Sequence, residues 1–166
     1  MLNLVNVSSL ERSTFDRLLN ESIITTTQKV SDNMYNTLKL CNIATYTIDN
    51  YIVGLTCYSF LTRNNKQYLH QRFAIYGCDI NNSKSWWFTE DFQRITAQFI
   101  SNIECSGIIT NPGTKFSDVI KTHIGSFNKY LCAPVEYDIE DIFGPGSSIM
   151  LPGGKCLVID LMGEDA

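Results

Sequence analysis

The chain has 166 residues, of which 44% are hydrophobic and 18% are charged, and its formal net charge is -4. This length fits one domain with a single hydrophobic core. Proteins that bind duplex nucleic acid carry a basic stripe that displaces counterions from the phosphates. The sequence contains no run of Lys or Arg, so we expect no direct nucleic-acid partner.

The polarity of the chain comes mainly from Asn, Thr and Ser, because its charged residues fall below the typical ~25%. Two explanations stay open. Either another subunit covers part of a lightly charged surface, or the chain comes from an AT-rich genome whose codons favour Asn, Ile, Lys and Tyr. The first explanation predicts protein partners or a homo-oligomer.

The cysteines are widely spaced and form no C-x-x-C pair, and the two histidines, His70 and His123, lie near none of them in sequence. Zinc sites use closely spaced ligand pairs, so we expect no metal. The N-terminus lacks a basic region followed by a long apolar stretch, and no segment approaches ~18 uninterrupted apolar residues. We therefore predict a cytoplasmic protein without membrane contact, whose thiols are free and buried. The six cysteines are Cys41, Cys57, Cys78, Cys105, Cys132 and Cys156.

The first third of the chain predicts a strand and two helices. Apolar residues at Leu2, Leu4 and Val7 indicate a short strand. The pattern Ser8-x-x-Glu11 matches a capping box and predicts a helix to about Asn20. Helical spacing then predicts a second amphipathic helix, with an apolar face made of Val30, Met34, Leu38 and Cys41.

The middle of the chain predicts three antiparallel strands. They cover Ile43–Ile48, Tyr51–Leu61 and Tyr68 to about Ile80, with turn residues at 49–50 and 63–66. Gly77, late in the third strand, indicates a bulge or a close approach of another backbone.

The last part of the chain alternates helices and strands. Thr89 is a good N-cap for a helix over 89–103, whose apolar stripe is Phe92, Ile95, Phe99, Ile100 and Ile103. A short strand, 107–110, ends at Asn111-Pro112-Gly113, and a helix over 116–124 ends at Gly125. A strand over Lys129–Ile139 and a hairpin over Ser147–Leu161 follow. Residues 144–166 thus form a hairpin or arm that either pairs with a neighbouring subunit or is the last strand of the domain itself.

These elements predict one domain spanning 1–166, of the α/β class. Alternation of the central helices and strands predicts a mixed, mostly antiparallel sheet of about seven strands with helices on both faces.

The order β-α-α-β-β-β-α-β-α-β-β resembles the GNAT (N-acetyltransferase) fold over nearly the whole chain. The stretch from Cys105 to Phe127 resembles the family's strand, asparagine, helix and closing Gly-Phe, with Asn111 and Gly125-Ser126-Phe127 at the matching places. The loop Ser83-Lys-Ser-Trp-Trp-Phe-Thr89 is similar to divergent GNAT-like internal virion and assembly proteins of tailed phages. The resemblance implies a V-shaped cleft where the fourth and fifth strands separate, near Gly77 and Ile108.

Active members of the family open the central helix with a loop R/Q-x-x-G-x-G/A, whose backbone amides bind the pyrophosphate of acetyl-CoA. The corresponding segment of this chain, 81–91, contains no glycine and ends in Glu90 and Asp91. The resemblance therefore implies a degenerate cofactor site and no bound cofactor. If acetyl-CoA does bind, the candidate contacts are Lys84, Ser85, Thr89 and Asn111. Asn111 is alternatively a simple turn residue of its Asn-Pro-Gly sequence.

The family's general acid, a tyrosine, is replaced at the matching position by Lys121. His70 and Asp79 are the candidates for a general base on the third meander strand. Trp86 and Trp87 serve either as an exposed anchor for a protein partner or as a hydrophobic staple on Phe92.

Two functions follow from the resemblance. The first is a non-catalytic protein of phage origin that binds other proteins in virion assembly, in the virion or in the host cytoplasm. The alternative is an acyl-CoA-dependent N-acetyltransferase that acts on a small amine or on protein amino groups.

Overall fold

The computed structural model describes residues 2–22, 26–77, 90–111, 129–146 and 155–163. Its centre is a seven-stranded sheet with the order β1-β2-β3-β4-β5-β7-β6. Strands β4 and β5 pair in parallel, and every other neighbouring pair is antiparallel. The strands are β1 Leu2–Val7, β2 Asn42–Ile48, β3 Tyr51–Arg63, β4 Lys66–Tyr76, β5 Gly107–Thr110, β6 Val135–Asp138 and β7 Lys155–Asp160.

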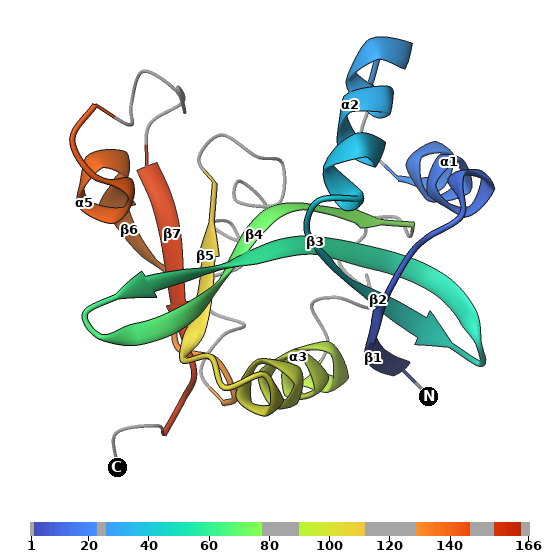
Figure 1. Ribbon diagram of the computed structural model, residues 1–166. Coiled ribbons are helices and arrows are strands. Elements are labelled where there is room, and N and C mark those ends of the chain that lie inside the picture. The colour runs from blue at the N-terminus through green and yellow to red at the C-terminus, as the bar shows by residue number, and fades with distance from the viewer. Residues whose placement is uncertain (1, 23–25, 78–89, 112–128, 147–154, 164–166) are drawn as a thin grey trace.

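Helices lie on both faces of the sheet, as Figure 1 shows. Helices α1 (Arg12–Glu21), α2 (Gln28–Leu38) and α5 (Ile139–Phe143) lie on one face, and α3 (Glu90–Asn102) lies on the other. The predicted fold class, a mixed and mostly antiparallel sheet between helices, is confirmed.

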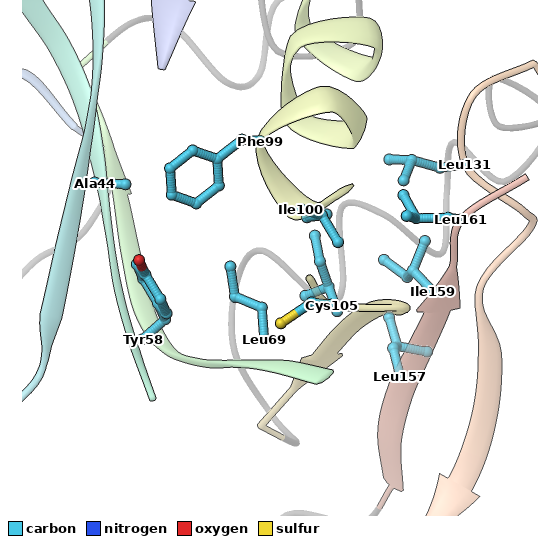
Figure 2. Packing of buried hydrophobic residues seen from close by; sticks show 11 residues of the cluster. Ala44, Tyr58, Leu69, Phe99, Ile100, Cys105, Leu131, Leu157, Ile159 and Leu161 are labelled. Atoms are coloured by element: carbon cyan, nitrogen blue, oxygen red, sulfur yellow. The ribbon is translucent and has the colours of Figure 1, made fainter. Parts of the chain in front are cut away.

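The largest core cluster lies between α3 and the sheet (Figure 2). Phe99 and Ile100 of α3 pack there against residues of β2, β3, β4 and β7, among them Ala44, Tyr58 and Leu69. The predicted stripe on this helix is largely confirmed, because Phe92, Phe99 and Ile100 are buried; Ile95 and Ile103 are half-buried. The helix also buries two polar residues, Gln93 and Thr96. The hydroxyl groups of Thr96 and Tyr46 lie 2.8 Å apart, within hydrogen-bond distance.

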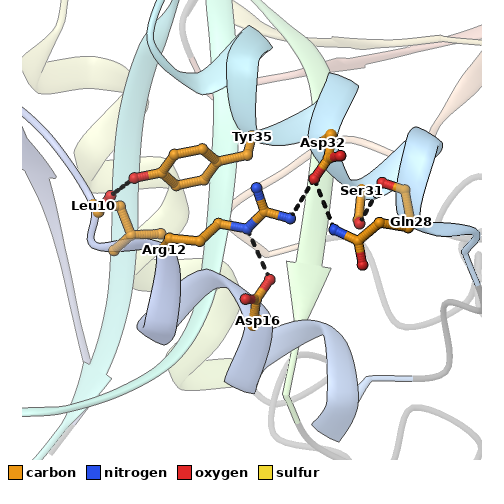
Figure 3. Close-up of polar contacts among 7 residues, drawn as sticks. All are labelled: Leu10, Arg12, Asp16, Gln28, Ser31, Asp32 and Tyr35. Atoms are coloured by element: carbon orange, nitrogen blue, oxygen red, sulfur yellow. Dashed lines mark hydrogen bonds and ion pairs between the residues drawn. The ribbon is translucent and has the colours of Figure 1, made fainter.

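The opposite face is covered differently. Phe15, Leu18 and Leu19 of α1 pack on apolar residues of the sheet. Helix α2 buries only Ser31 and Leu38, and it contacts α1 through polar side chains centred on Arg12 (Figure 3). The predicted apolar face of α2 is therefore only partly correct. Val30 is 46% exposed, and Cys41 lies beyond the end of the helix.

The predicted capping box at the start of α1 is wrong. The helix begins at Arg12, and Glu11 is the N-cap residue, with an extended backbone and no side-chain capping bond. Leu10, directly before the cap, is buried, and its carbonyl accepts a hydrogen bond from the Tyr35 hydroxyl at 2.6 Å. Thr27 is the real side-chain cap on this face, because its hydroxyl accepts from the Val30 amide at 3.2 Å.

The irregularity of β4 lies at Arg72 and not at Gly77. Cys57 of β3 pairs with Phe73, and the next residue, Tyr58, pairs with Gln71, so Arg72 is the extra residue of a bulge. Gly77 instead continues the ladder, since its amide donates to the Val53 carbonyl at 2.7 Å. A Cβ atom at Gly77 would lie only 3.1 Å from that carbonyl oxygen and 3.2 Å from a methyl of Leu18. The second alternative predicted for Gly77, a close backbone approach, is therefore the correct one.

The C-terminal third differs from the prediction. The strand expected over Lys129–Ile139 is reduced to β6, and Ile139 begins the short helix α5 instead. Strand β7 lies between β5 and β6 and pairs antiparallel with both. The helix predicted over 116–124 and the tip of the predicted hairpin, 147–154, lie outside the described residues.

No helix in the described ranges is long and apolar enough to cross a membrane. Five cysteines fall within these ranges, and all five are free thiols: Cys41, Cys57, Cys105, Cys132 and Cys156.

Candidate functional site

The parallel pair β4 and β5 stays together only briefly. Its register joins Leu69 to Ile108, His70 to Ile109 and Gln71 to Thr110. Beyond Gln71, β4 continues to Tyr76 without a β5 partner among the described residues. The two strands thus part after Gln71 and Thr110, close to the V-shaped opening that the GNAT resemblance implies. Ile108, which that prediction placed at the opening, is still paired with Leu69. In open sheets this is where a ligand finds polar backbone and side-chain groups.

Two residues predicted for a site meet at this opening. The Nε2 atom of His70 lies 2.7 Å from the Oδ1 atom of Asn111, and Asn111 donates from Nδ2 to the carbonyl of Arg72 at 3.3 Å. Because the amide nitrogen is used by that carbonyl, the oxygen faces the histidine, so Nε2 carries the proton and donates. Nδ1 is then the acceptor nitrogen of a neutral imidazole, and it has no hydrogen-bond partner within the described residues.

The surroundings of His70 keep it neutral. The side chain is half-buried, and the ring of Phe143 from α5 lies 5.0 Å away, centroid to centroid. Burial lowers the pKa of His70 below its ordinary value of 6.5; the hydrogen bond to Asn111 opposes this shift, and the positive charge of Arg72 adds to it. A neutral imidazole with an available Nδ1 can take a proton from an amine or a hydroxyl group.

Several predicted site residues cannot be placed in this way. The cofactor candidates Lys84, Ser85 and Thr89, the interaction candidates Trp86 and Trp87, and the acid and base candidates Lys121 and Asp79 lie outside the described residues. Arg72, in contrast, belongs to the opening and was not predicted. Its position depends on the bulge, for which the sequence has no marker such as glycine or proline.

The first turn of α3 is the other region that the sequence singles out. Glu90 accepts from the Lys129 ammonium at 2.7 Å and from the Tyr130 hydroxyl at 3.1 Å. These hydrogen bonds, led by that from Lys129, lower the pKa of the Glu90 carboxyl group. Asp91 forms an ion pair with Arg94 at 3.4 Å. Both carboxylates thus face a cation, and this neutralisation moderates the repulsion of an anion that the sequence predicts at the start of α3.

Metal ligation finds no support in the same ranges. Among the described residues, no group of three or more His, Cys, Asp or Glu side chains is placed to hold a metal ion.

Solved structures similar to this chain include acetyltransferases of the GNAT family. A GNAT-family acetyltransferase from Staphylococcus aureus has a TM-score of 0.56 and 12% identity, with 97% of this chain and 99% of that chain covered. A GNAT-family protein from Desulfovibrio desulfuricans has a TM-score of 0.54 and 8% identity, with 98% of each chain covered. The Bacillus subtilis N-acetyltransferase YlbP, in complex with coenzyme A, has a TM-score of 0.51 and 12% identity, with 96% and 99% covered.

No protein-family model and no curated protein sequence matches the chain. At such low identities the structural likeness establishes the fold and not the activity. The protein has the GNAT fold over nearly its full length.

Proposed function

We propose that this chain is a GNAT-fold protein-binding component of a phage virion or of its assembly, with a degenerate acetyl-CoA site. The observation that carries the proposal is the entrance to α3. The segment 81–91 has no glycine, and the helix begins with Glu90 and Asp91. The phage assignment depends on the likeness of the loop 83–89 to internal virion proteins.

The physical reason concerns the amides of the first helical turn. These amides form an anion site when small residues let a phosphate approach them. Here the same turn holds two carboxylates, and Glu90 is already joined to Lys129 and Tyr130. A pyrophosphate would have to displace these contacts or accept a nearby negative charge, and either change weakens its binding.

Calorimetry with acetyl-CoA tests this proposal. We expect no binding tighter than millimolar for the natural chain. As a matched pair, Glu90→Gln and Glu140→Gln remove one negative charge each, from α3 and from an exposed position of α5. A gain in acetyl-CoA affinity in the first variant alone would locate the obstruction at α3, whereas micromolar affinity of the natural chain would refute the proposal.

The protein-binding part of the proposal has its own test. The double variant Trp86→Ala, Trp87→Ala should lose its protein partner in a pull-down from phage-infected cells. Circular dichroism and the melting temperature of the variant separate loss of the partner from loss of the fold. Retained binding by the folded variant would exclude these two residues as the anchor.

A second candidate, an acyl-CoA-dependent N-acetyltransferase, is favoured by the pair His70 and Asn111. The pair lies where the described pairing of β4 with β5 ends. The imidazole is neutral, and its Nδ1 atom has no hydrogen-bond partner among the described residues. In this candidate, His70 takes the proton of a bound ammonium group. The neutral amine nitrogen would then form a C–N bond to the acetyl carbon while the C–S bond of the thioester breaks. The departing thiolate of coenzyme A would take up the proton that the nitrogen loses as the amide forms. The complex of the similar Bacillus subtilis protein with coenzyme A supports the choice of cofactor.

Acetylation of a panel of amines tests this candidate. Activity should fall as the pH drops through the lowered pKa of His70, because only the neutral ring accepts a proton. His70→Gln should reduce kcat by a factor of about 10²–10⁴, while Asn111→Asp should raise the pKa of His70 and shift the pH profile upward. If acetyl-CoA binds and His70→Gln retains full activity, His70 is not the base.

A further inference from the structure

Arg72 is an exposed arginine that has no acidic partner among the described residues. It takes part in none of the ion pairs between those residues, and the contact to Asn111 uses its backbone carbonyl as the acceptor. Other arginines of this chain are occupied. Arg12 and Arg17 form ion pairs with carboxylates, and Arg63 stacks on Tyr137 at 4.4 Å.

The bulge gives this arginine its position. Arg72 is the residue of β4 that has no counterpart in β3, and it directly follows Gln71, the last residue of β4 that pairs with β5. Bulges re-aim a side chain and end regular pairing, often beside a functional site. The Arg72 side chain therefore leaves the sheet where β4 and β5 separate.

The charge of Arg72 acts on the same face of the sheet as His70. Burial is the main cause of the lowered pKa of His70, and the charge of Arg72 contributes. Burial likewise raises the pKa of Cys57 to about 12, and Arg72 opposes that rise. Cys57 packs under α1 and α2, and His70 contacts α5, so the charge of Arg72 acts on two groups of the face that these helices cover.

Together the two side chains offer complementary chemistry. Nδ1 of His70 accepts a proton or a hydrogen bond, while the guanidinium of Arg72 offers several donors in a fork that suits a carboxylate or a phosphate. His70 and Arg72 are two positions apart in β4, and the Cα atoms of such residues in a strand lie roughly 6–7 Å apart. A small molecule with an amine at one end and an anionic group a few bonds away can therefore reach both.

We propose that Arg72 binds an anionic group of the molecule whose amine reaches His70, and so selects amines that also carry a carboxylate or a phosphate. This inference depends on the acyltransferase candidate for its chemistry. It makes a separate claim about ligand binding, which holds whether or not an acetyl group is transferred.

Binding of matched ligand pairs tests the proposal without any need for turnover. The probes are β-alanine against β-alaninamide, and phosphoethanolamine against ethanolamine, each titrated into the full chain by calorimetry. We expect the anionic member of at least one pair to bind about tenfold more tightly, as one charge-assisted contact allows. The pair that shows the difference identifies the group as a carboxylate or a phosphate.

Two arginine variants locate the effect. Arg72→Gln should abolish the preference for the anionic ligand, and Arg72→Lys should restore part of it. Arg63→Gln, at the turn end of the β3–β4 hairpin, is the matched control and should keep the preference for the anionic ligand. The side chain of Arg72 is exposed and the contact to Asn111 uses its backbone, so a melting temperature close to that of the natural chain is expected.

The possible results separate this inference from the proposed functions. Equal binding of both members of each pair, absence of binding by all four probes, or a preference that survives in Arg72→Gln would overturn it. Anion-dependent binding without acetyl transfer would support the Arg72 site and remove the acyltransferase candidate. Acetylation without preference for anionic amines would support the acyltransferase candidate and exclude the Arg72 site.

Discussion

Helices α3 and α2 cover opposite faces of the same sheet, yet different forces hold them. Helix α3 inserts Phe92, Phe99 and Ile100 into the core, where burial of apolar area stabilises it in any ionic condition. Helix α2 fully buries only Ser31 and Leu38, Met34 and Tyr35 pack partly buried on the core, and polar contacts join the helix to α1. The contacts of α2 are therefore more open to pH and to surface substitution than the apolar contacts of α3.

The contacts of α2 converge on Arg12, as Figure 3 shows. Its guanidinium donates to Asp32 at 2.7 Å and to Asp16 at 3.0 Å, and it lies 5.1 Å from the ring centroid of Tyr35. Gln28 also donates to Asp32, at 2.8 Å. Contacts of this exposed kind contribute little each, because water and salt compete with them.

Truncation of a core side chain of α3 should have the largest effect on stability. Phe99 is 7% exposed, and its ring packs edge-on against Tyr58 with centroids 6.0 Å apart. Phe99→Ala should lower the free energy of unfolding by about 3–5 kcal/mol, measured by chemical denaturation. Phe60→Ala is the control, because Phe60 also contacts Tyr58, at 5.7 Å, but is 46% exposed. Equal losses in the two variants would contradict the account of α3.

Removal of the cap of α2 should have an intermediate effect. Thr27→Ala deletes the hydroxyl that accepts from the Val30 amide, and such a change costs about 1 kcal/mol. Thr26→Ala, the same substitution one residue earlier, should cost less. If the two variants prove equally stable in denaturation experiments, the cap does not help to hold α2.

Acid should loosen α2 before it affects α3. The hydrogen bonds from Arg12 and then Gln28 lower the pKa of Asp32 below its ordinary value of 3.8. Because the folded-state pKa is depressed, this stabilisation is complete above the ordinary value and is lost as the pH falls through the folded-state value. Asp32→Asn should therefore make the melting temperature less dependent on pH below about pH 4 than that of the natural chain. If the melting temperature of the variant depends on pH as that of the natural chain does, other carboxylates cause the loss of stability in acid.

The ion pair at the start of α3 should matter least. Glu90 and Lys129 are 60% and 67% exposed at their side chains, so solvent screens their attraction. Glu90→Gln should leave the melting temperature unchanged within error at physiological salt. A loss as large as that of Thr27→Ala would mean that α3, too, depends on polar contacts.

The sequence by itself determined most of the elements and the class of fold. The signals that predicted them are local: strand-like alternation, helical spacing on α3, and the turn residues between β2, β3 and β4. Each can be read from one segment of the sequence without knowing which segments it contacts. Asp49, Asn50, Asn64 and Asn65 have positive φ angles in the structure, which explains why these residue types mark the two hairpins. The elements that were missed lack such signals. Helix α5 has only five residues, too few to show a period.

Tertiary structure alone decided the site. His70 and Asn111 are 41 positions apart. The sequence named each as a candidate for a different role, but it did not predict that they meet. The parallel pairing of β4 with β5 brings them together, and the bulge at Arg72 exists only because β3 and β4 differ in local length. Burial then sets the protonation of His70. Residue type supplies the chemical groups, but pairing register and burial are properties of the folded chain, and they decide which groups meet and in which charge state.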